Sequence, residues 1–401
     1  MRILLINQYA GAPTLGMQYR PHWMAVEWQR LGHEVLVVAG SHSHVRSVQP
    51  PSGRSRIEGV EFLTLDTPKY SDNGLQRFLS IMAFRTQLYR RSGSLADWRP
   101  DAVIASSIHP MDIRPALRVA RKVGAVLVHE VHDLWPLTPK LLGGMSDRHP
   151  MVMWMQREED LACREADLVV SLLPATLPYL QSRGLEAGRW THVSNGVPDT
   201  AVSDATQCQY ADGPTFRVGY FGAHGPANDL GTLIEAARQL QGEDVEVHLW
   251  GAGPAKSPLQ ARAADIPTVH FHDSVPPAAA RASMASMDAL YIGLVNSPLF
   301  QHGVSPNKMF DYMAAGRPII QAIDTPRSPA DEAGCAIRCR PGDPGAVIKA
   351  INELRGLGLQ KRTVMGTAGQ AYVRDTCTYS RLAASFAEAM ETAQSRQMTS
   401  A

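Results

Sequence analysis

Short apolar runs alternate with helical patterns along almost the whole chain. Ile3–Asn7 has the pattern of a buried strand, residues 18–31 have helical spacing that stops at Gly32, and Glu34–Ala39 is again apolar and rich in Val. Continuous apolar strands separated by helices are typical of a parallel sheet that helices cover on both faces. The start of the chain therefore predicts an α/β fold.

The alternation continues in two halves of similar architecture. Further strands are expected at Asp101–Ser106, Ala125–Glu130 and Asp167–Leu172, and then at Phe216–Phe221, Val245–Trp250, Val269–His272, Ala289–Val295 and Pro318–Ile323. Helices are expected at residues 111–123, 229–241, 307–315, 343–355, 360–374 and 379–395. The fold class predicted from this order is two doubly wound, Rossmann-like domains facing each other across a cleft, at the carboxyl ends of both sheets.

Composition limits the possible functions. The chain has 401 residues, of which 44% are hydrophobic and 19% charged, and its net charge of +1 gives no overall attraction for nucleic acid. No segment reaches the ~18 apolar residues of a membrane span, and the apolar start is too short for a signal peptide. Five cysteines, an odd number, argue against a disulfide framework, and Cys335 and Cys339 lack a second pair with zinc-ligand spacing. A cytoplasmic protein with reduced cysteines is expected.

The segment Ser305-Pro306-Asn307-Lys308 is the most informative motif. Ser305 is expected to cap a helix whose first residue is Pro306, and a helix N-terminus favours a phosphate. Lys308 is unfavourable beside the positive end of a helix dipole, so its presence indicates a bound anion. Asp311 lies one turn further on, where a carboxylate can accept hydrogen bonds from ribose hydroxyls. The alternative is an ordinary capped helix with a Lys–Asp surface pair.

Three further groups of residues lie at predicted strand ends. His132 and Asp133 follow one strand end, where ligands meet an open α/β sheet, and Glu130 just before them is a second candidate. Gly16 ends the loop after the first strand, where a side chain would block the approach of a ligand, although a simple turn also uses Gly. Gly251 and Gly253 follow another strand but lack the full dinucleotide fingerprint.

Taken together, these fragments resemble the family 4 retaining glycosyltransferases of the GT-B fold. The similarity is to a branch that acts in bacterial surface-polysaccharide synthesis and carries an S-P-N-K-x-F-[ED]-Y-M-A motif, which is SPNKMFDYMA in this chain. It extends over nearly the whole chain through Gly32-His33-Glu34-Val35, His132-Asp133-Leu134-Trp135-Pro136, Ser194-Asn195-Gly196-Val197 and Tyr220-Phe221-Gly222. Each fragment alone is weak, whereas their order and spacing are specific.

The resemblance implies a role for each domain. Residues 1–197 would bind the acceptor, residues 198–215 would be a linker, and residues 216–375 would bind a nucleotide sugar. Residues 376–401 would form a C-terminal helix that packs back on the N-terminal domain.

The resemblance also implies roles for single residues. The expected ligands of the donor diphosphate are Gly16, Gly222, His224, Ser305, Asn307 and Lys308. Asp311 would bind the ribose, and Gly251, Gly253 and Asp273 would contact the base. His132 and Asp133, with Lys308, would form the catalytic group.

The chain departs from the family pattern at two places. The first acid of the family's E-x7-E pattern falls on Gly303, and its second position is Asp311, which is shorter than Glu. The Arg and Lys that many members carry after the Tyr-x-Gly strand are absent from residues 223–228. Contacts to the donor must therefore be redistributed, and His224 is equally well explained as a phosphate donor and as a residue that caps its loop.

The implied reaction moves a glycosyl group from a nucleotide diphosphate sugar, UDP being the first choice, to a hydroxyl of a glycan or polyprenyl-diphosphate-linked acceptor. No Asp-x-Asp triplet is present, so neither a metal nor another cofactor is expected. Residues 75–91 form a basic amphipathic pattern that fits peripheral contact with the inner face of the membrane as well as packing on the domain. The alternatives are a nucleotide-sugar 2-epimerase or hydrolase, and a catalytically silent nucleotide-sugar-binding protein.

Overall fold

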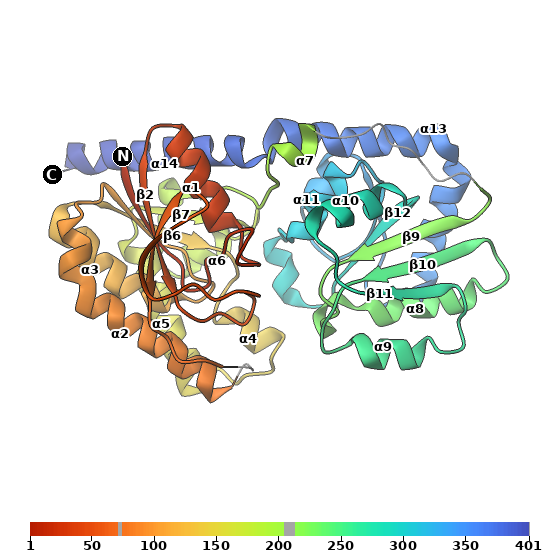
Figure 1. Cartoon of the computed structure of the whole chain (residues 1–401), viewed down its shortest axis with the longest axis horizontal. Helices are drawn as coiled ribbons and strands as arrows, with labels where there is room; N and C mark the ends of the chain where they lie inside the picture. The colour runs from red at the N-terminus through yellow and green to blue at the C-terminus, as the bar shows by residue number, and fades with distance from the viewer. Residues whose placement is uncertain (71–73, 204–212, 401) are drawn as a thin grey trace. The chain divides into compact units, whose positions relative to one another are not determined.

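The computed structural model describes residues 1–70, 74–203 and 213–400, and it divides into two compact units (Figure 1). The first unit contains residues 1–194 and the chain from Tyr379 onward, and the second contains Asn195–Thr378. Part of the expected linker, residues 204–212, lies outside the described residues, and α7 (Thr200–Ser203) precedes it. Among the described helices, none combines the length and the hydropathy that a membrane span requires.

The first unit is built on an eight-stranded sheet in the order β3-β4-β2-β1-β5-β6-β7-β8. The strands are β1 (Arg2–Ile6), β2 (Glu34–Gly40), β3 (Gly53–Ile57), β4 (Val60–Leu65), β5 (Ala102–Ala105), β6 (Val126–Val131), β7 (Leu168–Ser171) and β8 (Trp190–His192). All neighbours are parallel except β3 and β4, which form an antiparallel edge.

Helices cover both faces of this sheet. They are α1 (Arg20–Arg30), α2 (Leu75–Asp97), α3 (Ile113–Val123), α4 (Leu137–Leu141), α5 (Pro150–Glu165), α6 (Leu177–Ser182) and α14 (Tyr379–Ser400). Side chains alternate across a strand, so Ile3 and Leu5 join the core beneath α1 and α14, whereas Leu4 and Ile6 join the core beneath α2 and α3. Burial on both faces explains why the strands are continuously apolar.

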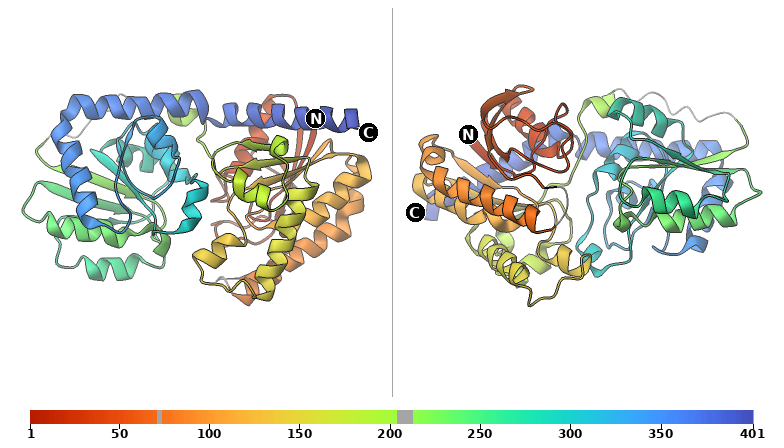
Figure 2. Two further views of the ribbon diagram at one scale, coloured as in Figure 1. Left: turned by 180° about the vertical axis from the view of Figure 1, so that it is seen from behind. Right: turned by 60° about the horizontal axis from the view of Figure 1, so that its bottom comes forward.

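The C-terminal helix α14 packs on the first unit beside α1 (Figure 2). The Trp28 indole N–H donates to the carbonyl oxygen of Ala383 at 3.0 Å, and its ring meets Phe386 edge-on at 5.3 Å. Trp23 stacks on Tyr379 at the start of the helix. The first unit therefore completes its core with residues from the far end of the sequence.

The second unit has a six-stranded, fully parallel sheet in the order β11-β10-β9-β12-β13-β14. Its strands are β9 (Phe216–Phe221), β10 (Val245–Trp250), β11 (Val269–His272), β12 (Ala289–Gly293), β13 (Ile319–Ala322) and β14 (Ala336–Arg338). Its helices are α8 (Leu230–Gln239), α9 (Lys256–Arg262), α10 (Pro277–Ala285), α11 (Asn307–Ala314), α12 (Pro329–Glu332) and α13 (Pro344–Thr376). The strand order reverses between β9 and β12, which is the switch point where such sheets bind ligands.

The predicted α/β fold with two doubly wound, Rossmann-like units is confirmed. The two helices expected at residues 343–355 and 360–374 form one element, α13, which is interrupted at Gly358 with φ +72°. Within the described residues, Cys163, Cys335, Cys339 and Cys377 are free thiols, and Cys208 lies outside them.

Candidate active site

Lys308 lies at the switch point of the second sheet, in the first turn of α11. Its ammonium donates to the Tyr220 hydroxyl at 2.8 Å and to Asn228 Oδ1 at 2.6 Å, and it lies 4.6 Å from the centre of the Tyr220 ring. No acidic side chain of the described residues forms an ion pair with it. Burial lowers the pKa of Lys308 to about 7. The chain thus holds a largely buried cation among neutral groups, an arrangement that favours a bound anion.

Gly222 makes room for this lysine. It has φ +148°, and a Cβ at this position would lie 3.2 Å from Lys308 Cε. Two glycines after β10 approach the same loop, because a Cβ on Gly253 would lie 2.6 Å from the carbonyl oxygen of His224, and one on Gly251 would meet Gly222. The structure therefore gives Gly251 and Gly253 a packing role at the edge where they were expected to contact a base.

The expected cap of α11 is wrong. The helix begins at Asn307 with Pro306 before it, and the Ser305 side chain does not cap it. Instead, Ser305 Oγ accepts from the Asn195 backbone N–H at 2.9 Å, and the Asn195 side-chain amide donates to the Ser305 carbonyl at 2.6 Å. Asn195 belongs to the Ser-Asn-Gly-Val motif, and its two hydrogen bonds fix the loop that precedes α11. The side chain of Asn307 is exposed.

His224 does not expose its imidazole to a ligand, which corrects its expected role at the diphosphate. The residue is fully buried, neither ring nitrogen has a hydrogen-bond partner in the part of the chain that the structure describes, and burial lowers its pKa. Its ring contacts Phe271 and Tyr220 edge-on or tilted. Asp273, expected at the base, is exposed and pairs with Lys256 at 2.8 Å.

Asp311 is half-buried on α11, and it does not form the alternative surface pair with Lys308. Burial raises the pKa of Asp311 to about 6, while the positive charge of Arg281 opposes the shift. Gly303, which stands where many relatives have the first acid of the pattern, has φ +92°. A glutamate would be strained in this left-handed conformation, which fits the presence of glycine instead of an acid at this position.

A second polar group lies at the carboxyl end of the first sheet, around His132. Its Nε2 lies 3.1 Å from Glu130 Oε2 and 3.1 Å from the Ser106 hydroxyl, and that hydroxyl donates to Glu130 at 2.5 Å. Glu130 Oε1 accepts from Arg20 Nε at 3.0 Å. Burial alone would raise the pKa of Glu130, but Arg20, His132 and Ser106 together hold that pKa well below its usual range. The carboxylate therefore stays charged and orients His132.

Sequence reasoning underrated Glu130 and missed Arg20 and Ser106. Glu130 lies inside β6, and its apolar neighbours concealed a polar role. Arg20 begins α1 as an unusual buried cation, which also donates to the carbonyl oxygens of Val193 and Ser194.

Asp133 and Gly16, the other two site residues expected in the first unit, differ in their exposure and hydrogen bonding. Asp133 is exposed beyond His132 and has no hydrogen-bond partner among the described residues. Gly16, with φ +106°, uses its N–H to close a tight turn on the carbonyl oxygen of Ala12 at 2.9 Å. Its N–H is therefore not available to a donor phosphate in this conformation, and a Cβ at Gly16 would collide with the backbone N of Ser47.

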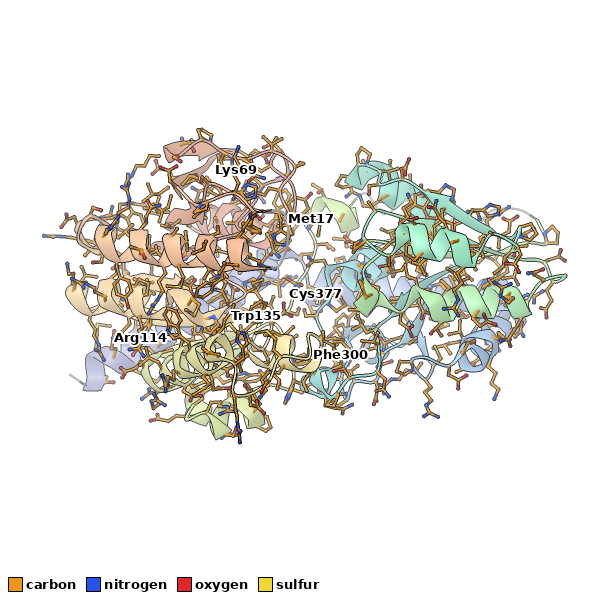
Figure 3. The ribbon with its side chains drawn as sticks, turned by 90° about the horizontal axis from the view of Figure 1, so that it is seen from below. Met17, Lys69, Arg114, Trp135, Phe300 and Cys377 are labelled. Atoms are coloured by element: carbon orange, nitrogen blue, oxygen red, sulfur yellow. The ribbon has the colours of Figure 1, made fainter. Side chains whose placement is uncertain are left out.

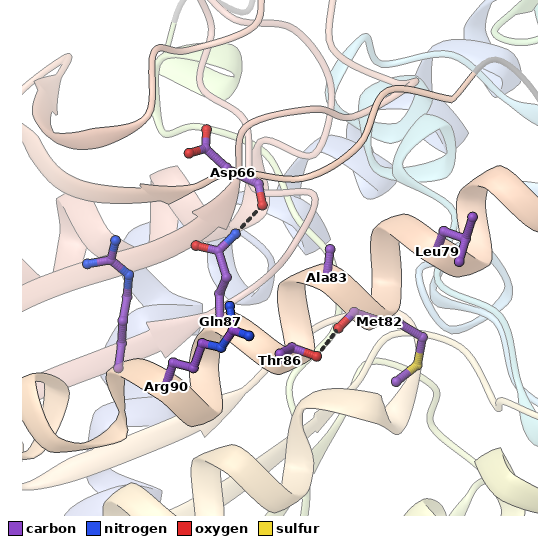
Figure 4. A pocket seen from close by; sticks show the side chains of 8 residues that line it. Asp66, Leu79, Met82, Ala83, Thr86, Gln87 and Arg90 are labelled. Atoms are coloured by element: carbon purple, nitrogen blue, oxygen red, sulfur yellow. Dashed lines mark hydrogen bonds between the residues drawn. The ribbon is translucent and has the colours of Figure 1, made fainter.

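The basic helix α2 shows a partly open apolar surface. Ile81, Phe84 and Leu88 face the core, whereas Leu75 and Leu79 are 72% and 50% exposed. Leu79 lines a shallow pocket of about 710 Å³ together with Met82, Ala83, Thr86, Gln87, Arg90, Arg91 and Asp66 (Figure 4).

A second cavity, of about 810 Å³, lies beside the start of α2. Its lining includes Phe78, Trp154 and Trp135, and Trp135 follows His132 and Asp133 in sequence. Trp135 is labelled in Figure 3. Residues of α2 therefore line both of these hollows.

Comparisons with known proteins assign both units to glycosyltransferase domains. Residues 16–196 match the glycosyl transferase 4-like domain, and residues 215–356 match the glycosyl transferases group 1 family. No curated protein matches the chain significantly by sequence.

Several solved structures share its fold. HepE of Anabaena, in complex with UDP and glucose, is 15% identical with a TM-score of 0.66, covering 98% of this chain and 99% of that one. Sucrose-phosphate synthase of Thermosynechococcus elongatus is 13% identical with a TM-score of 0.76 over 100% of both chains. The galactosyltransferase WaaB of the lipopolysaccharide outer core, in its apo form, is 14% identical with a TM-score of 0.67, covering 98% and 99%.

The first family model thus covers most of the first unit, and the second covers most of the second unit. Both models describe glycosyltransferase domains. The protein belongs to the family 4-like glycosyltransferases with the GT-B fold.

Proposed function

We propose that this protein is a retaining glycosyltransferase that takes a sugar from a nucleotide diphosphate sugar, with a UDP-sugar as the first choice. The acceptor is a hydroxyl of a lipid-linked or free saccharide in polysaccharide synthesis. The fold is shared with HepE, whose structures contain UDP and UDP-glucose, and this supports the choice of donor.

The observation that carries the proposal is the environment of Lys308. Among the described residues, its ammonium contacts the neutral oxygens of Tyr220 and Asn228 and the face of the Tyr220 ring, and it forms no ion pair. A diphosphate would supply the missing negative charge and raise the lowered pKa of the lysine. As the bond to the leaving group breaks, negative charge grows on the diphosphate, and a fixed cation stabilises it most at that stage.

In the proposed reaction, the bond between the anomeric carbon and the diphosphate oxygen breaks, and a bond from the acceptor oxygen forms on the same face of the sugar. The acceptor hydroxyl gives its proton to the leaving phosphate oxygen. The products are the glycoside and the nucleoside diphosphate. This route needs no enzyme nucleophile, so the chain's task is to bind, orient and stabilise charge.

His132 and Asp133 are the proposed contacts to the transferred sugar and the acceptor. The buried carboxylate of Glu130 fixes the His132 ring, which leaves Asp133 as an open hydrogen-bond acceptor in the same loop. Asp311 is the proposed ribose ligand. Helix α2 adds exposed Leu75 and Leu79 to basic residues, which supports contact of the first unit with an anionic membrane that carries the acceptor.

The experiment measures nucleoside diphosphate release by the purified chain from UDP-, GDP- and dTDP-sugars, with and without a membrane lipid extract. Release from one donor that rises with the extract, together with a glycolipid product of retained configuration, supports the proposal. Release without any glycosylated product would favour the epimerase or hydrolase. Binding of the nucleotide without release under any condition would favour the silent binding protein.

A further inference from the structure

A cluster of histidine and glutamate side chains lies on one face of the second sheet, over β10 and β11. Glu246 and His248 are alternate residues of β10, and His270 and His272 are alternate residues of β11. The parallel register pairs His248 with His270. Because alternate residues of a strand share a face, the four side chains project from the same side, opposite the buried Val247 and Leu249.

The spacing of the ligand atoms fits one metal ion. Glu246, His248 and His270 each offer an atom within 4.8 Å of the other two, and Glu246 Oε2 lies 3.3 Å from His248 Nε2. A tetrahedral zinc site, with bonds of about 2.0–2.2 Å, places its ligand atoms about 3.3–3.6 Å apart. The distance between Glu246 Oε2 and His248 Nε2 already lies in this range. The three side chains are only half-buried, so they can rotate to close the remaining distance.

His272 prepares His248 for this role. Its Nε2 lies 3.2 Å from His248 Nδ1, and the two rings lie nearly parallel. When His248 Nδ1–H donates to His272, the lone pair of His248 Nε2 faces Glu246. Metal-bound histidines are usually oriented by such a hydrogen bond from their other nitrogen.

The charged neighbours of the cluster are Arg217 and Lys256. Arg217 Nε lies 3.6 Å from Glu246 Oε2, and Lys256 is held at Asp273 and at the carbonyl oxygen of His272. Arg217 can share Glu246 with an ion because a carboxylate has two oxygens. His248 Nε2 also lies within hydrogen-bond distance of Glu246, and its ring stacks on that of His270. A bound ion would replace the hydrogen bond between His248 and Glu246.

We propose that Glu246, His248 and His270 bind a transition-metal ion that prefers imidazole and carboxylate ligands, Zn²⁺ above all, with water completing the coordination. The ion would bridge β10 to the edge strand β11. The site is separate from the proposed sugar transfer, and its test does not use activity.

The test uses the full-length, tag-free chain after removal of metal by a chelator. Calorimetric titration with Zn²⁺ is expected to show one tight equivalent, and Co²⁺ is expected to give the visible spectrum of a tetrahedral site. His248→Ala and His270→Ala should each remove the tight equivalent. His272→Ala should weaken it ~10–100-fold, since that ring only positions a ligand. Trp250→Phe, which changes a stacked neighbour without altering a ligand, should bind as the wild type does.

Wild-type protein without a tight Zn²⁺ equivalent would overturn the proposal, as would unchanged affinity in both His248→Ala and His270→Ala. Folding is checked by circular dichroism. If an alanine variant does not fold, His270→Gln replaces it, and the thermal midpoint is followed. Zn²⁺ should raise the midpoint of the wild type but not that of His270→Gln, because only a bound ion stabilises the native state. Equal rises in both would also refute the site.

Discussion

A Cβ atom on Gly251 would lie only 2.0 Å from the carbonyl oxygen of Gly222. The loops after β9 and β10 therefore touch backbone to backbone, and Gly251 has φ +142°. This contact holds Gly222 where the stem of Lys308 passes it. Gly251, which was expected to contact a base, therefore shapes the loop that follows β9.

Gly251→Ala is expected to destabilise the protein by ~3 kcal/mol, through the clash and the strained backbone together. Denaturant unfolding of the full chain measures this loss. Gly225→Ala, in the loop after β9, is the control, because its Cβ would make an ordinary contact of 3.4 Å with Asn228. Equal effects of the two variants would contradict the argument.

Lys308→Ala is expected to lower turnover ~10²–10³-fold while the chain stays folded, because it removes a contact that stabilises charge on the leaving diphosphate. Near-normal turnover would remove Lys308 as a diphosphate ligand. Steady-state rates at saturating donor, with circular dichroism for folding, provide the measurement.

The affinity for the nucleoside diphosphate should fall as the pH rises above about 7, where free Lys308 loses its proton. The slope should approach tenfold per pH unit as long as the bound lysine stays protonated. Calorimetry across this range tests the slope and the accompanying uptake of a proton. Lys308→Arg should flatten the profile, since arginine stays charged, and a steep profile in that variant would point to another group.

Glu130→Gln is expected to cost roughly 3–5 kcal/mol of stability at neutral pH, because it leaves the buried Arg20 without its counter-charge. The pKa of Glu130 is held below its usual 4.5, so its contribution is present above that value and is lost as the pH falls through the folded-state pKa. The difference from wild type should therefore shrink in acid. Glu34→Gln, which breaks an exposed pair with Arg2, is the control and should cost under about 1 kcal/mol.

Turnover is expected to survive metal chelators, because the proposed charge stabilisation comes from Lys308 and the start of α11. Rates with EDTA and with added Mg²⁺ or Mn²⁺ should agree. Activity that is lost on chelation and restored by a divalent ion would refute metal independence. Zn²⁺ binding at His248 and His270 is measured separately and does not bear on this outcome.

Leu75→Gln with Leu79→Gln is expected to weaken binding to anionic vesicles by at least ~10-fold, since two exposed leucines lose their burial in the lipid. Co-sedimentation with anionic and neutral vesicles measures the fraction of protein bound to each. Leu359→Gln, at a comparably exposed leucine on α13, should have no effect. Unchanged binding in the double variant would favour α2 as an ordinary packing helix.

The alternation of apolar strands and helices predicted the parallel sheets because the central strands, such as β1, β5, β6 and β12, are buried on both faces. Elements with weaker patterns were not singled out: β3 is mostly exposed, β8 and β14 have three residues each, and α5 begins at Pro150 after a polar loop. The formation of these four elements depends on packing against the rest of the unit more than on a local pattern of apolar residues.

At the candidate site, Lys308 was found because a cation at a helix start is locally unfavourable. The exact start of α11 was missed, because Ser305 is recruited by Asn195, 110 residues away in sequence. The burial of His224 and the polar role of Glu130 likewise arise from contacts between distant segments, which no local motif records.

The dependence of the first unit on α14 has a consequence for the order in which the protein can fold during synthesis. Trp28 emerges early from the ribosome, but its partners Ala383 and Phe386 are made only after the second unit is complete. The N-terminal core must therefore wait, with an apolar face open, while about 350 residues are translated. Chaperones that bind nascent chains would need to cover the apolar face of α1 for most of synthesis. A nonsense mutation before Tyr379 would give a chain with a fully translated second unit and a first unit that lacks α14.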